Sequence, residues 1–137
     1  MKALVTGGSK RIGGAISLYL AQRGYDVAVH FNSSAQEADE LVAQINAGAT
    51  RGVALQADLL DHDQVDGLID RASAALGGPL TVLINNASIF ESDTIETADR
   101  ASWDRHIDSN LWAPFRLTQH FVEQAPDPDI DVNGEPR

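Results

Sequence analysis

The fold is decided by the stretch Leu4-Val5-Thr6-Gly7-Gly8-Ser9-Lys10-Arg11-Ile12-Gly13-Gly14. Residues 3–5 are apolar and typical of a short buried strand. The glycines that follow carry no side chain to obstruct a tight turn or the approach of a ligand. From Ile12 onward the apolar residues change to helical spacing, so the turn leads into a helix. One stripe of that helix is predicted to hold Ile12, Ala15, Ile16, Tyr19 and Leu20.

The start of this helix suits a phosphate group. Unpaired N–H groups and the positive end of the helix dipole favour an anion there, and Lys10 and Arg11 add two cations. A tight turn without a ligand is the alternative for this stretch taken alone. The residues predicted to bind a cofactor at the turn are Gly7, Ser9, Lys10, Arg11 and Ile12.

Composition limits the classes of function. The 137 residues are enough for one domain with a modest core. A net charge of −10 without a basic stripe argues against a nucleic-acid partner and against an anionic membrane surface. The absence of cysteine excludes disulfides and thiolate metal sites, and the histidines at 30, 62, 106 and 120 are too scattered to predict a metal site. Without a signal peptide or a long apolar run, we expect a cytoplasmic protein.

Short apolar segments alternate with helical patterns along the chain. After the first strand, strands are predicted at 27–31, 52–57 and 80–84, and a long helix at 102–124. This alternation predicts an α/β fold with a doubly wound parallel sheet and helices on both faces. The predicted domain covers residues 1–125, and the acidic, proline-containing segment 126–137 is expected to be irregular.

Polar residues follow each of the later strands, at the edge where parallel strands place their binding sites. The second strand is followed by Asn32-Ser33-Ser34, and Ser34 with Glu37 has the spacing of a helix capping box. The third strand is followed by Asp58-Leu59, and the fourth by Asn85-Asn86-Ala87-Ser88.

The order of these motifs resembles the short-chain dehydrogenase/reductase family. The resemblance rests on the turn from Thr6 to Gly13, on Asp58, on Asn85-Asn86-Ala87-Ser88 and on Asn110. It covers the chain as far as Gln124. Further features are most similar to the pteridine reductase branch of the family: Arg11, Ser88, His30-Phe31-x-x-Ser34 and Ala113-Pro114-Phe115.

The resemblance implies a Rossmann-like domain with a nicotinamide cofactor across the carboxyl ends of the strands. It places Asp58 and Leu59 beside the adenine, and Asn85 and Ala87 along the path to the ribose and nicotinamide. The pteridine reductase branch further implies that Ser88 contacts the substrate and that Phe90 stacks on a flat heterocycle such as a pterin.

The segment after the second strand predicts which cofactor binds. An acidic residue there would bond the ribose 2′-hydroxyl of NAD and repel a 2′-phosphate. Asn32, Ser33 and Ser34 are neutral donors instead, with Lys10 and Arg11 predicted nearby. The sequence therefore favours NADP(H) over NAD(H).

Asn110 is the predicted catalytic residue. Because Pro114 has no N–H, the carbonyl of Asn110 loses its partner within the predicted helix and is expected to bind water. The resemblance implies that this water belongs to a proton relay. A proline kink without chemistry is the alternative.

The family's catalytic tyrosine, followed four residues later by a lysine, has no match in this sequence. The tyrosines are Tyr19 and Tyr25, and the lysines are Lys2 and Lys10. We therefore expect cofactor binding without turnover, in a chain that holds the first four strands and their helices of a reductase acting on a small molecule. The alternatives are a non-catalytic nucleotide-binding or sensing module, and a half-domain completed by a second chain. Family analogy implies a homo-oligomer, specifically a tetramer.

Overall fold

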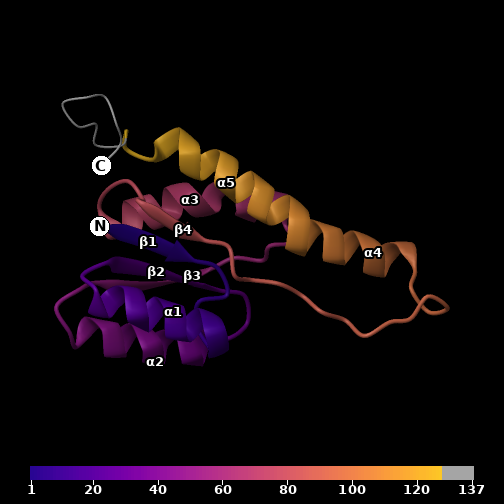
Figure 1. Cartoon of the computed structure of the whole chain (residues 1–137), viewed down its shortest axis with the longest axis horizontal. Coiled ribbons are helices and arrows are strands. Elements are labelled where there is room, and N and C mark those ends of the chain that lie inside the picture. Colours follow the sequence, from indigo (N-terminus) through magenta and orange to yellow (C-terminus); the bar gives the residue numbers. More distant parts are fainter. Residues whose placement is uncertain (128–137) are drawn as a thin grey trace, which may run out of the picture.

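The computed structural model describes residues 1–127, in which a parallel sheet lies between two layers of helices (Figure 1). The predicted irregular segment 126–137 falls mostly outside the described residues. The elements as far as the last strand are β1 (Lys2–Val5), α1 (Arg11–Gln22), β2 (Asp26–Phe31), α2 (Ala35–Asn46), β3 (Gly52–Gln56), α3 (His62–Leu76) and β4 (Val82–Ile84).

The four strands are all parallel and lie in the order β3-β2-β1-β4. This confirms the predicted fold class, a doubly wound α/β sheet with the first four strands present. In the register of the sheet, Val5 is opposite both Val29 and Ile84. The chain therefore leaves β1, β2 and β4 at the same edge, where parallel α/β sheets bind their ligands.

The fourth strand is shorter than the sequence predicts. It begins at Val82 rather than at residue 80. Leu80 is fully buried, and its N–H donates to Oε1 of the Gln124 side chain at 2.7 Å instead of to a neighbouring strand. A side chain from the last helix thus fixes the chain before β4 begins.

Each face of the sheet has its own hydrophobic core. On one face, Leu4 and Ala28 pack with residues of α3 and of the last helix. On the other face, Val5, Val27 and Val29 pack with residues of α1 and α2. The alternation along β1 and β2 follows from the two-residue period of a strand.

The predicted apolar stripe of α1 is only partly right: Ile16 and Leu20 pack against the core, but the other three residues of the stripe are exposed. Ile12 and Tyr19 are 72% and 52% exposed, whereas the buried residues of the helix are small: Gly13, Gly14, Ser17 and Ala21. Small side chains let the helix lie close to the turn that precedes it, and the Ser17 hydroxyl donates to the Gly8 carbonyl at 3.0 Å. The buried face of α1 is therefore the face whose small side chains allow close approach to the turn, and not the face with the largest apolar side chains.

The single helix predicted at 102–124 is also wrong, because a π-helical turn interrupts it. The structure has α4 (Arg100–Ile107), a π turn (Asp108–Trp112) and α5 (Ala113–Gln124). The Ala113 N–H reaches back five residues to the Asp108 carbonyl. Pro114 then lies in the first turn of α5, where its missing N–H is tolerated. None of the helices within residues 1–127 has the length and apolar character needed to cross a bilayer.

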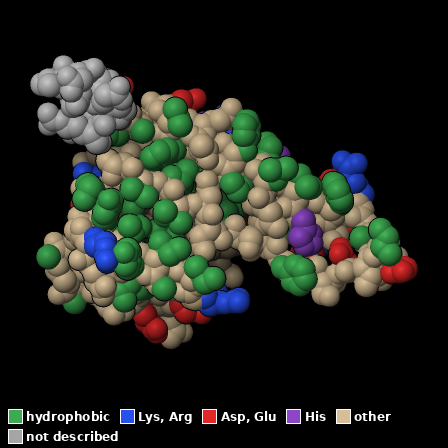
Figure 2. Space-filling view, in the orientation of Figure 1, with side chains coloured by type: hydrophobic (Ala, Val, Ile, Leu, Met, Phe, Trp, Pro, Cys, Tyr) green, Lys and Arg blue, Asp and Glu red, His purple; other side chains and the backbone are tan. Residues whose placement is uncertain are grey.

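The outer face of α4 and α5 carries large apolar side chains, which Figure 2 shows along the upper right of the molecule. Trp103, Leu111, Phe115 and Val122 are each more than half exposed. Apolar patches of this kind mark interaction surfaces when they are contiguous.

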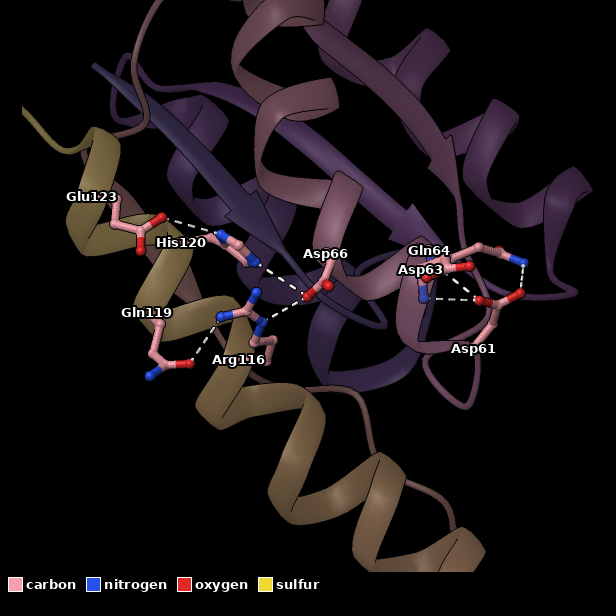
Figure 3. Close-up of polar contacts among 8 residues, drawn as sticks. All are labelled: Asp61, Asp63, Gln64, Asp66, Arg116, Gln119, His120 and Glu123. Atoms are coloured by element: carbon pink, nitrogen blue, oxygen red, sulfur yellow. Dashed lines mark hydrogen bonds and ion pairs between the residues drawn. The ribbon is translucent and has the colours of Figure 1, made fainter.

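Polar contacts join α3 to α5 (Figure 3). Arg116 donates from Nε to Oδ1 of Asp66 at 2.6 Å, and Nε2 of His120 lies 3.2 Å from the same oxygen. The hydrogen bond from Arg116, followed by that from His120, lowers the pKa of Asp66 below its ordinary value. At the start of α3, the Asp61 carboxylate accepts the N–H groups of Asp63 and Gln64 and caps the helix.

Replacing Leu117 by alanine is expected to lower the free energy of unfolding by about 2–5 kcal/mol, because the side chain is fully buried between α5 and α3. The matched control is Leu111→Ala, which removes the same atoms from a side chain that is 62% exposed. The control should change stability by less than about 0.5 kcal/mol in urea unfolding. Equal losses in the two variants would contradict the packing described.

Asp66→Asn should lower stability at neutral pH and flatten its decline in acid. A carboxylate whose pKa is lowered by folding adds stability above its unfolded pKa of about 4, and this stability is lost as the pH falls through the lower folded value. Urea unfolding at neutral and acid pH measures both effects. Asp70→Asn, exposed on the same helix, is the control and should keep the wild-type pH dependence.

Candidate functional site

A cavity of about 470 Å³ lies at the carboxyl ends of the strands. The predicted cofactor residues that line it are Gly7, Ser9, Lys10, Arg11, Ile12, Asn32, Ser33, Ser34, Asp58, Leu59 and Ala87, and it also includes the predicted substrate residue Ser88. These residues come from the turn after β1 and from the segments after β2, β3 and β4. The topology therefore brings separate motifs of the sequence to one site.

The glycines of the turn allow two pieces of backbone to touch. Gly7 has a φ of 59°, in the left-handed region that disfavours side chains. A Cβ on Gly13 would collide with the Gly7 carbonyl oxygen, so the start of α1 packs directly against the turn. The backbone of Gly7 and Gly13 therefore forms part of the cavity wall.

The turn is braced by the segment that follows β4. The Thr6 hydroxyl accepts the N–H groups of Asn86 and Ala87, each at 3.0 Å. In return, the Asn86 side-chain amide donates to the carbonyls of Thr6 at 2.9 Å and Gly7 at 3.1 Å. These contacts join residues about 80 positions apart in the sequence. This role of Asn86 was not predicted, because the residues next to it in the sequence do not reveal its partners.

His30 braces the turn from β2, a role that was not predicted, although the His30-Phe31-x-x-Ser34 segment was among the features similar to the pteridine reductase branch. Its side chain is 2% exposed. The Gly7 N–H donates to Nδ1 at 3.0 Å, and Nε2 lies 3.0 Å from the Ala57 carbonyl. Burial lowers the pKa of His30, which favours the neutral ring. A polar residue in an otherwise apolar strand was the available signal.

The start of α1 is arranged for an anion. In the described structure Lys10 provides no side-chain cap for the helix, and the first turn contains no acidic residue. Helix N–H groups and the positive dipole end therefore face the cavity together with Lys10 and Arg11. The Asp58 carboxylate is partly engaged, since it accepts the Leu60 N–H at 3.0 Å.

The capping box predicted after β2 is not formed. Ser34 is the N-cap residue of α2, but its side chain makes no capping hydrogen bond, because the φ and ψ of −88° and 58° differ from the extended conformation typical of such caps. The Ser33 and Ser34 side chains line the cavity beside Lys10 and Arg11.

Three predicted site residues do not line this cavity. The Asn85 side chain donates to the Thr118 hydroxyl at 3.2 Å, on α5. Phe90 is 89% exposed and borders a separate hollow next to Trp103. The Asn110 side chain accepts the Ile89 N–H and donates to the Ile89 carbonyl, both at 2.9 Å, so it holds the backbone next to Ser88. The roles predicted for these three residues remain predictions.

The comparison with known families decides the chain's classification. The sequence model described as short chain dehydrogenase matches residues 1–128. The chain belongs to the short chain dehydrogenase family. Among curated relatives, the 3-oxoacyl-[acyl-carrier-protein] reductase FabG of Staphylococcus aureus is 38% identical over 122 residues, which are 89% of this chain and 49% of that protein. The chain spans about half the length of the curated relatives it matches.

Solved structures agree with this family. FolM, alternative dihydrofolate reductase 1 from Brucella suis in complex with NADP, is 39% identical with a TM-score of 0.87, covering 95% of this chain and 53% of FolM. A blue fluorescent protein from a metagenomic library in complex with NADPH is 37% identical with a TM-score of 0.87, covering 92% and 51%. The predicted family is confirmed, and the likeness to FolM agrees with the predicted similarity to the pteridine reductase branch.

Arg11→Gly is expected to stabilise the fold. Arg11 has a φ of 54°, and it is the one residue other than glycine within residues 1–127 to adopt the left-handed region. That conformation costs about 1–2 kcal/mol for a residue with a Cβ, and the backbone entropy of glycine offsets part of the gain, so we expect an increase of up to about 1 kcal/mol in urea unfolding.

The control for Arg11→Gly is Arg11→Ala, which removes the guanidinium but keeps the Cβ and its strain. It should have wild-type stability. A gain in both variants would assign the effect to charge rather than to the backbone.

Proposed function

We propose that this chain forms the dinucleotide-binding half of an NADPH-dependent short-chain oxidoreductase. The observation that carries the proposal is the cavity in which an uncapped helix start, two cations and a neutral segment after β2 meet. When bound, NADPH would supply a hydride for reduction of a carbonyl or C=N bond. The chain's own residues would bind and orient it.

The residues that line the cavity suit such a cofactor in their chemistry. The backbone of the turn from Gly7 to Gly13 would hold the pyrophosphate, because this stretch contains the uncapped start of α1 and lines the cavity. Asp58 and Leu59 would flank the adenine, and Ala87 would lie on the path toward the nicotinamide.

The preference for NADPH rests on charge. Asn32, Ser33 and Ser34 are neutral, and Lys10 and Arg11 line the same cavity, so the cavity combines hydrogen-bond donors with positive charge for a 2′-phosphate. NADP and NADPH complexes of similar structures support this assignment.

A pterin-like compound is the proposed substrate. Ser88 lines the cavity, and Asn110 holds the neighbouring Ile89 backbone through two hydrogen bonds. We propose that Ser88 contacts the substrate, that Phe90 stacks on its ring, and that the Asn110 carbonyl holds a relay water. The likeness to an alternative dihydrofolate reductase supports a pterin-like ring, and the likeness to FabG supports the broader class of carbonyl substrates.

Two further features of the proposal concern the chain as a whole. Residues 1–137 contain no tyrosine followed four residues later by lysine, so we propose that this chain binds the cofactor without turning it over. The exposed side chains of Trp103, Leu111, Phe115 and Val122 support a homo-oligomer, because association would cover them.

Fluorescence titration with NADPH and NADH tests the cofactor assignment. We expect NADPH to bind at least about tenfold more tightly, as hydrogen bonds to a charged group contribute about 1.5–3 kcal/mol. Ser33→Asp should reverse the preference by placing a carboxylate where the 2′-phosphate binds. Arg11→Gly and Arg11→Ala should both weaken NADPH binding.

The control for the charge change is Ser92→Asp, which adds the same charge at an exposed position outside the cavity and should leave selectivity unchanged. If Ser33→Asp kept the wild-type preference for NADPH over NADH, the proposed position of the 2′-phosphate would be contradicted. No binding of either nucleotide by the wild-type protein would exclude the dinucleotide site itself.

A further inference from the structure

His30 is the buried titratable group that touches the cofactor turn. It lies on β2 two residues after Ala28, on the face covered by α3, and it also lines the cavity. Its main-chain carbonyl accepts the Gly8 N–H at 2.8 Å, while its ring accepts the Gly7 N–H at 3.0 Å. One residue thus holds two successive amides of the turn.

The partners of the ring define its protonation state. The Ala57 carbonyl can only accept a hydrogen bond, so the Nε2 atom facing it must carry the proton. In a neutral imidazole Nδ1 is then an acceptor, which matches the Gly7 N–H that points at it. A second proton has room only on Nδ1, where it would face the Gly7 N–H donor directly.

We propose that His30 is a positioning residue for the cofactor, whose neutral Nε2–H tautomer orders Gly7 and whose protonation releases the turn and weakens dinucleotide binding. The inference rests on the proposed function. Protonation would leave the Gly7 N–H without its acceptor and would place a cation on a ring that is 2% exposed.

The charged groups around His30 influence the pH at which its protonation would weaken dinucleotide binding. Arg71 of α3 acts on the ring as a like charge, and Lys10, Arg11 and Asp58 line the same cavity. Burial is the largest cause of the lowered pKa of His30, and the field of Arg71 adds to it. The neutral ring is therefore the form at neutral pH, and the release is expected as the pH falls below the ordinary histidine value of about 6.5.

Two substitutions of His30 separate the role of Nδ1, which accepts the Gly7 N–H, from the role of Nε2, which donates to the Ala57 carbonyl. His30→Asn places an amide oxygen near the position of Nδ1, so it can accept the Gly7 N–H without titrating. His30→Gln places its amide near the position of Nε2, so it can donate to Ala57 but leaves Gly7 without an acceptor. His120→Gln, on α5 outside the cavity, is the control for loss of a histidine.

The experiment measures NADPH and NADH affinity from about pH 7.5 to about pH 5.5, with circular dichroism confirming that each variant stays folded. Because burial holds the pKa of His30 below its ordinary value, we expect the wild-type dissociation constants for both nucleotides to rise by less than about tenfold, with the increase confined to the acid end of this range. The use of NADH matters because the 2′-phosphate of NADPH takes up a proton near about pH 6. His30→Asn should lose the pH dependence toward NADH, His30→Gln should bind about tenfold more weakly at every pH, and His120→Gln should behave as wild type.

Nuclear magnetic resonance without nucleotide provides an independent test. The His30 ring should show the Nε2–H tautomer at neutral pH, and the Gly7 amide signal should shift with the titration of His30 in the wild type but not in His30→Asn. An Nδ1–H tautomer or a static Gly7 amide would overturn the inference. A Gly7 amide signal that shifts with pH while the NADH affinity stays constant across the pH range would also overturn the inference. That outcome would leave the proposed cofactor binding intact. Absence of nucleotide binding at neutral pH would overturn the proposed function, and this inference with it.

Discussion

The position of Gly7 is the constraint on which the site depends. Its N–H is held by His30 from β2, its carbonyl by Asn86 from the segment after β4, and its backbone is packed against Gly13 at the start of α1. Two partners that are distant in the sequence therefore converge with the adjacent helix start on one residue. Each of these contacts is to the backbone of Gly7, so together they fix the conformation of the turn at the edge of the cavity.

The fold was predictable because its signals are local and repeated. Short apolar strands separated by helical patterns indicate a parallel sheet, and the glycine turn indicates where its binding edge lies. The buried face of α1 was not predictable from apolar spacing, because the helix approaches the turn through Gly13, Gly14 and Ser17. The π turn was missed for a similar reason. One extra residue in a turn leaves the apolar pattern of the flanking segments nearly unchanged.

Most predicted cofactor residues line one cavity, because each directly follows a strand and parallel strands end at a common edge. Residues in the long segment after β4 were harder to place. That segment is held by the π turn through Asn110 and by α4 through His106, and no periodicity encodes such contacts. The bracing by His30 and Asn86 escaped notice because hydrogen bonds across 23 or 79 positions leave no local pattern.

The strand order has a consequence for how the protein assembles during synthesis. β1 pairs with β2 close by in the chain, but its other neighbour, β4, begins only at Val82. A nascent polypeptide that ends before this point lacks Asn86, whose side chain donates to the carbonyls of Thr6 and Gly7 in the turn. Loop closure over so many residues is slow. The nucleotide pocket is therefore completed only once β4 and the segment after it have been made, although the glycine turn lies much earlier in the chain.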